Sequence, residues 1–210
     1  MTMMKKLFVF LFAAFAIASA QAQVAPDVMI QQTTEEVLDI ISKDKDIQGG
    51  NTHKAIELID KKVLPNFNFQ HMTALAVGKD WKKASPAQQG QLVAEFRTML
   101  VRTYANALTG YKSQKVVYKP LKMNAGDVDA LVRTEVAQPG SKPIPLDYNL
   151  EKLDTGWKVY DVTVAGVSLV TNYREQFAQE VRNGGIDGLV ASISTKNKSL
   201  EANQGKAEKK

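Results

Sequence analysis

The chain has 210 residues, a formal net charge of +5 at pH 7 and no cysteine. Without cysteine, neither a disulfide scaffold nor a lipidated cysteine anchor is possible. The two histidines, His53 and His71, lie far apart outside any metal-binding motif, and the sequence contains no glycine-rich phosphate loop. Metal and nucleotide chemistry are therefore disfavoured, and the modest charge argues against a nucleic-acid binder.

The N-terminus has the organisation of an export signal. Lys5 and Lys6 precede an uncharged apolar run that ends at Ile17, and small residues follow. This pattern predicts a secretory signal peptide over residues 1–22, cleaved before Gln23, with a site two residues earlier as the alternative. A retained anchor is less favoured, because the run is shorter than the ~20 residues of a spanning helix. We expect a soluble bacterial periplasmic protein.

The next part of the chain has helical spacing. Apolar residues predict a helix over 26–42, a second over 51–65 and a short third over 69–77. The run Ser85-Pro86-Ala87-Gln88 is a helix start signal, since serine caps, proline fits the first turn and glutamine can complete a capping box. It predicts a long fourth helix.

The middle of the chain changes from helical spacing to alternation, which is typical of β-strands. Strands are expected at 113–119, 128–138, 144–153 and 157–164. Short loops separate them, including a tight hairpin at Asp154-Thr155-Gly156. The predicted order is an antiparallel meander.

Residues 157–177, WKVYDVTVAGVSLVTNYREQF, join the last strand to a helix through a bend at Gly166. Apolar side chains alternate onto both faces of that strand, which predicts cover on two sides. Gly184-Gly185 interrupts the helix, and a last short amphipathic helix follows. We expect a single α+β domain over residues 23–195, in which helices cover one face of a curved sheet of about four strands, and a polar lysine-rich tail over 196–210.

Asp161 is the most interesting titratable residue, because it lies beside Tyr160 in an otherwise apolar strand. A buried acid can act as a catalytic base, but a carboxylate bonded to backbone amides of a neighbouring turn is the favoured interpretation. The segment around Ser168 resembles a nucleophile elbow superficially, yet it lacks the second glycine and a following histidine. Ser168 is predicted to cap a helix instead.

Two groups of lysines could contact anionic headgroups, at ~1 kcal/mol for each basic residue near such a surface. One is Lys79, Lys82 and Lys83 around Trp81, and the other is in the tail. Ordinary solvation of both groups is the favoured alternative.

Several motifs, in a fixed order, resemble those of one known family. They are W-K-V-Y-D-V, G-V-S-L-V and Y-R-x-x-F within 157–177, Phe67 and Phe69, Gly78-Lys79 with Trp81, Ser85-Pro86-Ala87-Gln88-Gln89, and Thr103-Tyr104-Ala105. These motifs span nearly the whole mature chain. The chain therefore resembles the MlaC family of Mla-system periplasmic phospholipid-binding proteins, which are also called toluene-tolerance auxiliary proteins. Asn68 departs from the pattern, which more often has aspartate after Phe67.

The resemblance implies an NTF2-like or cystatin-like fold with a deep apolar pocket between sheet and helices. It implies a monomeric phospholipid carrier, with bound phospholipid as cargo and no cofactor, rather than an enzyme. The implied partners are an outer-membrane lipoprotein–porin complex and an inner-membrane ABC transporter with a lipid-channel component. Ferrying phospholipid between them would maintain outer-membrane lipid asymmetry.

A carrier of this kind needs a dry pocket, because exposing the acyl chains of a phospholipid to water is costly. Roughly thirty methylenes at ~0.8 kcal/mol each give a cost on the order of 24 kcal/mol. We expect acyl chains to contact apolar residues of the helices, the strands and the bend, although plain core packing is the alternative for each. The predicted contacts are Leu75, Phe96, Met99, Leu100, Tyr104, Val132, Val136, Tyr148, Val162, Val164, Val167 and Leu169.

Two other functions stay open at this point. An NTF2-like enzyme would use Asp161 and Tyr160 as acid and base on a small polar or steroid-like substrate. A periplasmic chaperone or interaction module would bind unfolded peptides and lack a deep cavity.

Overall fold

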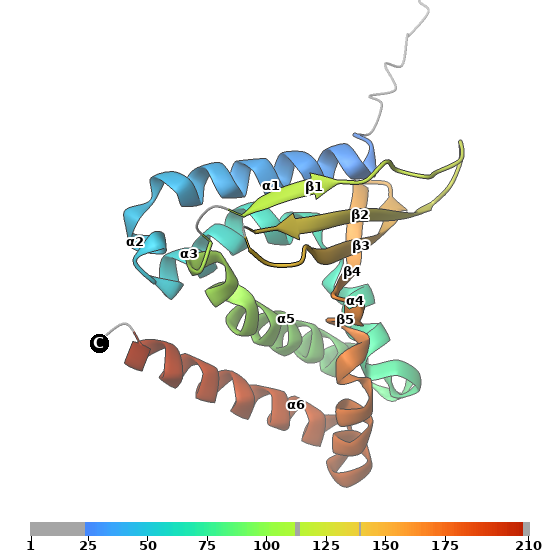
Figure 1. Cartoon of the computed structure of the whole chain (residues 1–210). Coiled ribbons are helices and arrows are strands. Elements are labelled where there is room, and N and C mark those ends of the chain that lie inside the picture. Colours follow the sequence, from blue (N-terminus) through green and yellow to red (C-terminus); the bar gives the residue numbers. More distant parts are fainter. Residues whose placement is uncertain (1–23, 112–113, 139, 208–210) are drawn as a thin grey trace, which may run out of the picture.

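The computed structural model describes residues 24–111, 114–138 and 140–207. It confirms an α+β fold, in which an antiparallel sheet and a set of helices form one body (Figure 1). The predicted signal peptide lies outside the described residues. None of the described helices combines the length and the apolarity that a bilayer crossing requires.

The first half of the described chain is helical, as predicted. Its elements are α1 (Pro26–Lys43), α2 (Lys45–Gln48), α3 (Thr52–Leu58), the π-helical turn η1 (Ile59–Val63), the 3-10 turns η2 (Leu64–Asn66) and η3 (Gly78–Lys83), α4 (Phe69–Val77) and α5 (Pro86–Thr109). The capping box of Ser85 and Gln88 is confirmed at the start of α5. The predicted 51–65 helix is not uniform, because it widens into η1 and then tightens into η2 around Pro65, which cannot donate a helical hydrogen bond.

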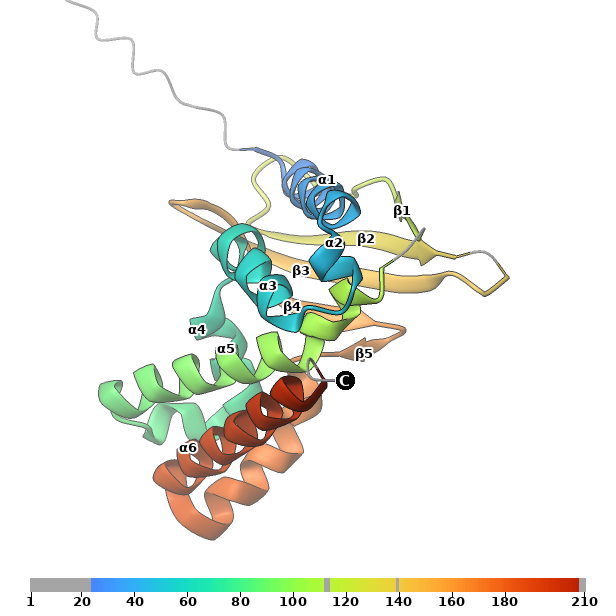
Figure 2. The same ribbon diagram turned by 90° about the vertical axis from the view of Figure 1, so that its left-hand side faces the viewer.

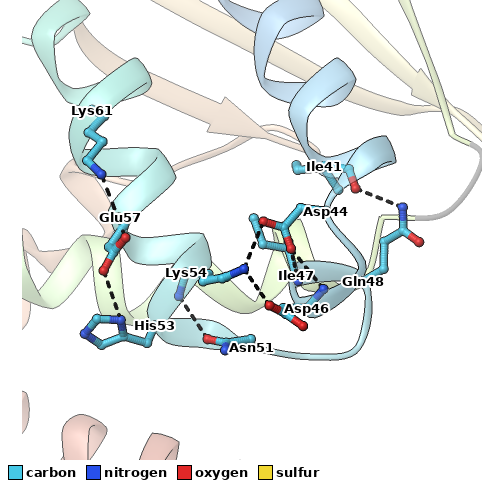
Figure 3. Close-up of polar contacts among 10 residues, drawn as sticks. All are labelled: Ile41, Asp44, Asp46, Ile47, Gln48, Asn51, His53, Lys54, Glu57 and Lys61. Carbon is cyan, nitrogen blue, oxygen red and sulfur yellow. Dashed lines mark hydrogen bonds and ion pairs between the residues drawn. The ribbon is translucent and has the colours of Figure 1, made fainter.

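A polar turn fixes the direction in which α3 leaves α1, and it contains the short helix α2 that the sequence did not predict (Figure 3). The Asp44 carboxylate accepts hydrogen bonds from the backbone amides of Asp46 and Ile47, at 2.9 and 3.1 Å. Asn51 Oδ1 caps α3 by accepting from the Lys54 amide at 3.0 Å. The bond from Ile47, with those from Asp46 and Lys54, holds the pKa of Asp44 below its ordinary value.

The sheet is a meander of β1 (Lys115–Tyr118), β2 (Asp129–Ala137), β3 (Ile144–Leu153), β4 (Gly156–Val164) and β5 (Val167–Ser168), in that spatial order. Each strand is antiparallel to the next. The four predicted strands are confirmed, and β5 adds a short fifth. Tyr148 lies opposite both Val132 and Val162, so apolar side chains form rows across one face.

The bend after β4 differs from the prediction. Ala165 and Gly166, with φ of 50° and 84°, form a tight turn that returns the chain into β5, where Val167 pairs with Val164. The turn η4 (Thr171–Tyr173) follows before the last helix, α6 (Arg174–Ala207), begins. The helix therefore starts later than expected, because the chain first completes the sheet.

The helix cap predicted for Ser168 is wrong, because Ser168 lies in β5 and η4 begins after Val170, which makes no side-chain cap. Ser168 instead holds the turn between the two elements. Its Oγ accepts hydrogen bonds from the backbone amides of Val170 and Thr171, at 3.2 and 2.9 Å. The serine thus fixes the chain as it leaves β5 for the helices.

α6 turns sharply at Gly185, whose φ of 68° and ψ of −167° fall in a region that is open essentially to glycine alone. The second half of the helix then runs alongside α5 (Figures 1 and 2). It continues to Ala207, so most of the predicted polar tail is helical. Asn197 explains this docking: it is buried, and its Nδ2 donates to the backbone oxygen and to Oε2 of Glu95, at 2.9 and 2.7 Å.

Two large apolar clusters hold the fold together. The helical cluster joins α4, α5 and α6, and the sheet cluster joins the inner face of the sheet to α1. Phe67 packs against both clusters. Trp157 and Val159 of β4 belong to the sheet cluster, whereas Tyr160 packs against the helical cluster, so this strand is covered on two sides as predicted.

Candidate functional site

A cavity of about 300 Å³ lies between α5 and the β3–β4 part of the sheet, and we call it the first lobe. Its walls are apolar apart from the hydroxyl of Tyr104, and no charged side chain lines it within the described part of the chain. The lining residues are Ile59, Val63, Leu64, Phe67, Phe69, Met72, Leu100, Val101, Tyr104, Ala107, Leu108, Leu146, Val162, Val164 and Leu169.

A second cavity of about 470 Å³, the second lobe, lies between α1, the end of α5 and β1 to β3. It is lined by Met29, Ile30, Thr33, Thr34, Val37, Leu38, Val63, Asn66, Phe67, Ala107, Leu108, Tyr111, Gln114, Val116, Val136, Gln138, Ile144, Leu146 and Tyr148. Several of its polar groups satisfy one another: Asn66 Nδ2 donates to Thr33 Oγ1 at 2.9 Å, and Tyr111 Oη donates to the Gln114 carbonyl at 2.8 Å. The lobe therefore offers few free polar groups to a ligand.

The two lobes adjoin, because five residues line both of them. These shared residues are Val63, Phe67, Ala107, Leu108 and Leu146. The result is one apolar hollow, extending from α1 to the β4–β5 hairpin, with a junction in the middle.

Backbone contacts position the junction. The segment after η2 is fixed to the free edge of β4, where Phe67 forms a β-bridge with Val159 and the Asn68 amide donates to the Val159 carbonyl at 2.8 Å. Asn68 also starts α4, since its Oδ1 accepts from the His71 amide at 3.1 Å. Phe67 is thereby held between the lobes, and Phe69 and Met72 of α4 face the first lobe.

Tyrosines show that the walls are poorly hydrated. Burial raises the pKa of Tyr148, which lines the second lobe, above its ordinary value of 10.0, and its neighbour Tyr118 adds to the shift. Burial likewise raises the pKa of Tyr118. A wall that disfavours the charged phenolate suits an apolar ligand rather than an ion.

The structure places seven of the predicted lipid-contacting residues on the hollow. In the first lobe these are Leu100, Tyr104, Val162, Val164 and Leu169, and in the second Val136 and Tyr148. Whether they contact lipid stays a prediction.

The other five predicted residues lie elsewhere. Leu75, Phe96 and Met99 pack in the helical cluster, Val132 is buried in the sheet cluster, and Val167 is 54% exposed. Helical spacing identified α5 as a wall, but Phe96 and Met99 lie on the part of it that meets α6. Val167 lies beyond the Gly166 turn, where the chain reverses and its side chain is left in solvent.

Sequence reasoning missed the junction residues and the contribution of α1. Leu146 alternates with Tyr148 on the same face of β3, and Leu108 lies one turn after Tyr104 on α5, so both could have been included. Ile30 and Val37 belong to the predicted stripe of the first helix. No local pattern indicates that this stripe faces a cavity, because the sheet beneath it is distant in sequence.

The residues considered for catalysis lie outside both lobes. Asp161 Oδ1 accepts a hydrogen bond from the Val162 amide at 2.8 Å. The backbone thus holds the carboxylate, but through the next residue of the same strand and not through the neighbouring turn that was expected. Tyr160 stacks on His71 with ring centroids 4.5 Å apart, and His71 Nδ1 lies 2.8 Å from Glu151 Oε1. Within the described ranges, no three His, Cys, Asp or Glu side chains form a group that could hold a metal ion.

The basic cluster on η3 also lies away from the lobes. Lys83 Nζ is 2.6 Å from the buried carboxylate of Asp80, and Trp81 packs against the helical cluster. A contact of this cluster with headgroups stays a prediction.

Comparisons with known proteins point to one family. The family model of the MlaC protein matches residues 31–195. A toluene tolerance protein, ttg2D, of Pseudomonas putida is 29% identical over 178 residues, which are 84% of this chain and 82% of that protein. The intermembrane phospholipid transport system binding protein MlaC of Haemophilus influenzae is 26% identical over 189 residues, 88% of each.

A solved structure gives the same result. It is that of a phospholipid-binding protein from Ralstonia solanacearum in complex with a phospholipid, 38% identical, with a TM-score of 0.79. The match covers 85% of this chain and 99% of that one. The resemblance seen in the sequence is confirmed, and the chain belongs to the MlaC family.

Proposed function

We propose that this protein is a periplasmic phospholipid carrier, exported by a cleavable signal peptide, which shelters acyl chains in the two-lobed hollow. The observation that carries the proposal is the junction, where two apolar lobes meet at five shared side chains. Among the residues that the structure describes, neither lobe has a charged lining residue. Such a shape fits a ligand with two apolar chains that diverge from one point. The lobes have the dimensions of ligand pockets, roughly 300–1,000 Å³.

The hollow is accessible from the surface. Tyr104 lines the first lobe and is 36% exposed, and Ile144 lines the second and is 38% exposed. Acyl chains can therefore enter while the polar headgroup stays in water. Because the tails are also dry in a bilayer, the carrier has only to match that environment, and specific headgroup contacts are not required.

The same geometry supports binding without catalysis. The ionisable side chains that line the hollow are tyrosines, and burial raises the pKa of Tyr148. A tyrosine that remains neutral is a poor general base at neutral pH. The proposed activity is thus to take up and release lipid unchanged.

The proposed role extends to partners. A relative is named as the binding protein of an intermembrane phospholipid transport system. By analogy, this protein would receive and deliver phospholipid at an outer-membrane lipoprotein–porin complex and an inner-membrane ABC transporter with a lipid-channel component, and so maintain outer-membrane lipid asymmetry. Energy for a direction would come from the transporter.

The test is to purify the protein gently from a Gram-negative host and to record native mass spectra before and after organic extraction. We expect phospholipid on the wild type and none on Leu108→Glu/Leu146→Glu, because a buried carboxylate at the junction is costly beside acyl chains. The matched control, Val117→Glu/Val128→Glu, changes exposed residues outside both lobes and should retain lipid.

Circular dichroism and thermal unfolding would show that both variants are folded. A folded Leu108→Glu/Leu146→Glu protein with its normal lipid would contradict the pocket. A wild type without lipid would contradict the carrier. N-terminal sequencing of the periplasmic fraction should begin at Gln23.

A further inference from the structure

A second hollow lies on the other side of the helical layer. It measures about 340 Å³ and is bordered by α5, Tyr173 and both halves of α6. We call it the α5–α6 groove. Its lining residues are Met99, Thr103, Tyr173, Gln176, Phe177, Ser192, Ile193, Lys196 and Leu200.

Fixed contacts keep this groove open. The turn at Gly185 sets the two halves of α6 apart. Phe96, Tyr173 and Phe177 stack and meet edge to face, with centroids 5.3 to 5.5 Å apart, which gives one wall a rigid aromatic support. On the opposite side, Asn197 is bonded to Glu95 of α5, so α6 cannot approach further without losing buried hydrogen bonds.

The groove has an apolar floor and a polar rim. Met99, Phe177 and Ile193 are buried at its base, with exposed fractions of 4%, 2% and 3%. At the rim, the side chains of Gln176 and Lys196 are exposed and have no hydrogen-bond or ion-pair partner among the residues that the structure describes. The rim therefore presents the Lys196 ammonium and the Gln176 amide above an apolar floor.

The groove is distinct from the lipid hollow, since none of the described residues lines both the groove and either lobe. The two spaces are neighbours, since Met99 and Thr103 of the groove are followed directly in α5 by Leu100 and Tyr104 of the first lobe. Burial, with the contact from Tyr104, raises the pKa of Tyr173 to about 12. Tyr173 therefore stays neutral at physiological pH.

We propose that the α5–α6 groove is a second binding site, which takes an anionic amphiphile with a single alkyl chain. The volume lies near the lower end of the range for ligand pockets, which suits one chain rather than two. The chain would lie on Met99, Phe177 and Ile193. The anionic head would reach the Lys196 ammonium, with the Gln176 amide as a further donor. This site does not depend on the proposed carrier function.

Two methionines allow a direct test, because Met99 lines the groove and Met72 lines the first lobe. Dodecanoate, kept below its micelle concentration, would be titrated into protein carrying 13C-methyl methionine and its copurified lipid. We expect a saturable shift of the Met99 methyl while Met72 is unchanged. Ser192→Trp, which fills the groove from its rim, should abolish the Met99 shift. A shift of Met72 alone, or of neither methyl, would overturn the second site.

The charge of Lys196 provides a second test of the proposed site. Lys196→Gln should weaken dodecanoate binding about threefold, the size of a partly exposed ion pair. Lys198→Gln, an exposed lysine on the same helix outside the groove, should leave it unchanged. Neutral 1-dodecanol should bind wild type and Lys196→Gln equally. If Lys196→Gln binds dodecanoate as tightly as wild type does, the anionic class of ligand is wrong.

Discussion

The two halves of α5 both carry apolar side chains, but these side chains have opposite surroundings. In the first half, Leu92 and Phe96 are fully buried in the helical cluster against α4 and α6. In the second half, Tyr104, Ala107 and Leu108 face the hollow. One helix thus forms part of a solid core along one stretch and the wall of a cavity along the next.

The comparison shows what makes a hollow. Aromatic side chains from α5, η4 and α6 fill the space around the first half. Around the second half, the facing elements are a curved sheet and η1, whose positions are fixed by hydrogen bonds, such as the one from the Asn68 amide to Val159. Apolar walls that cannot approach one another leave a space between them. Few polar groups of these walls are free to hold water there, so the space suits an apolar ligand.

The largest expected effect is in the solid half. Phe96→Ala should lower the free energy of unfolding by about 3–5 kcal/mol, since it removes a fully buried ring and leaves a cavity. Leu108→Ala should cost clearly less, because Leu108 already borders open space. Urea unfolding of both variants measures the difference, and equal losses would show that the hollow is packed in solution.

An effect of intermediate size on stability should distinguish two alanines in the second half of α5. Ala105 is fully buried against Ile59 and Val101, whereas Ala107 is exposed and lines both lobes. Ala105→Phe should lower the free energy of unfolding by about 1–3 kcal/mol through overpacking. Ala107→Phe should change it by no more than about 0.5 kcal/mol, yet reduce the copurified phospholipid. Normal lipid content in a stable Ala107→Phe protein would contradict the position of the junction.

The smallest effect is a pH dependence. The pKa of Tyr173 rises from 10.0 to about 12, because burial and the contact with Tyr104 disfavour the phenolate. In the unfolded chain Tyr173 has its ordinary pKa of 10.0, so it ionises at a lower pH than in the folded protein. The free energy of unfolding should therefore fall as pH rises from 10.0 to about 12, with no such loss below that window. Tyr173→Phe keeps the ring and removes this contribution. The measurement is the urea midpoint of the wild type and of Tyr173→Phe at neutral and alkaline pH. If both proteins lose the same stability between these pH values, the raised pKa of Tyr173 is contradicted.

Much of the fold was predictable because its signals are local. The capping box of Ser85 and Gln88, the alternation in the four long strands and the break at Gly184-Gly185 are all visible in short windows of sequence. The predictions were wrong where contacts between segments that are far apart in the sequence determine the local structure. The tail lysines suggested solvation, but that part of the helix docks on α5, where Asn197 bonds Glu95 and Arg102 pairs with Glu201. The short strand β5 forms because its partner β4 is already in place.

The candidate site was only partly predictable for the same reason. Sequence alone determined the apolar character of α5, the order of helices and strands, and the family motifs. Only the tertiary structure decided that Phe67, Leu108 and Leu146 meet at the junction of two lobes, while Phe96 lies in a solid core. Hydropathy reports which side chains leave water, whereas a cavity depends on the distance between walls that are far apart in the chain.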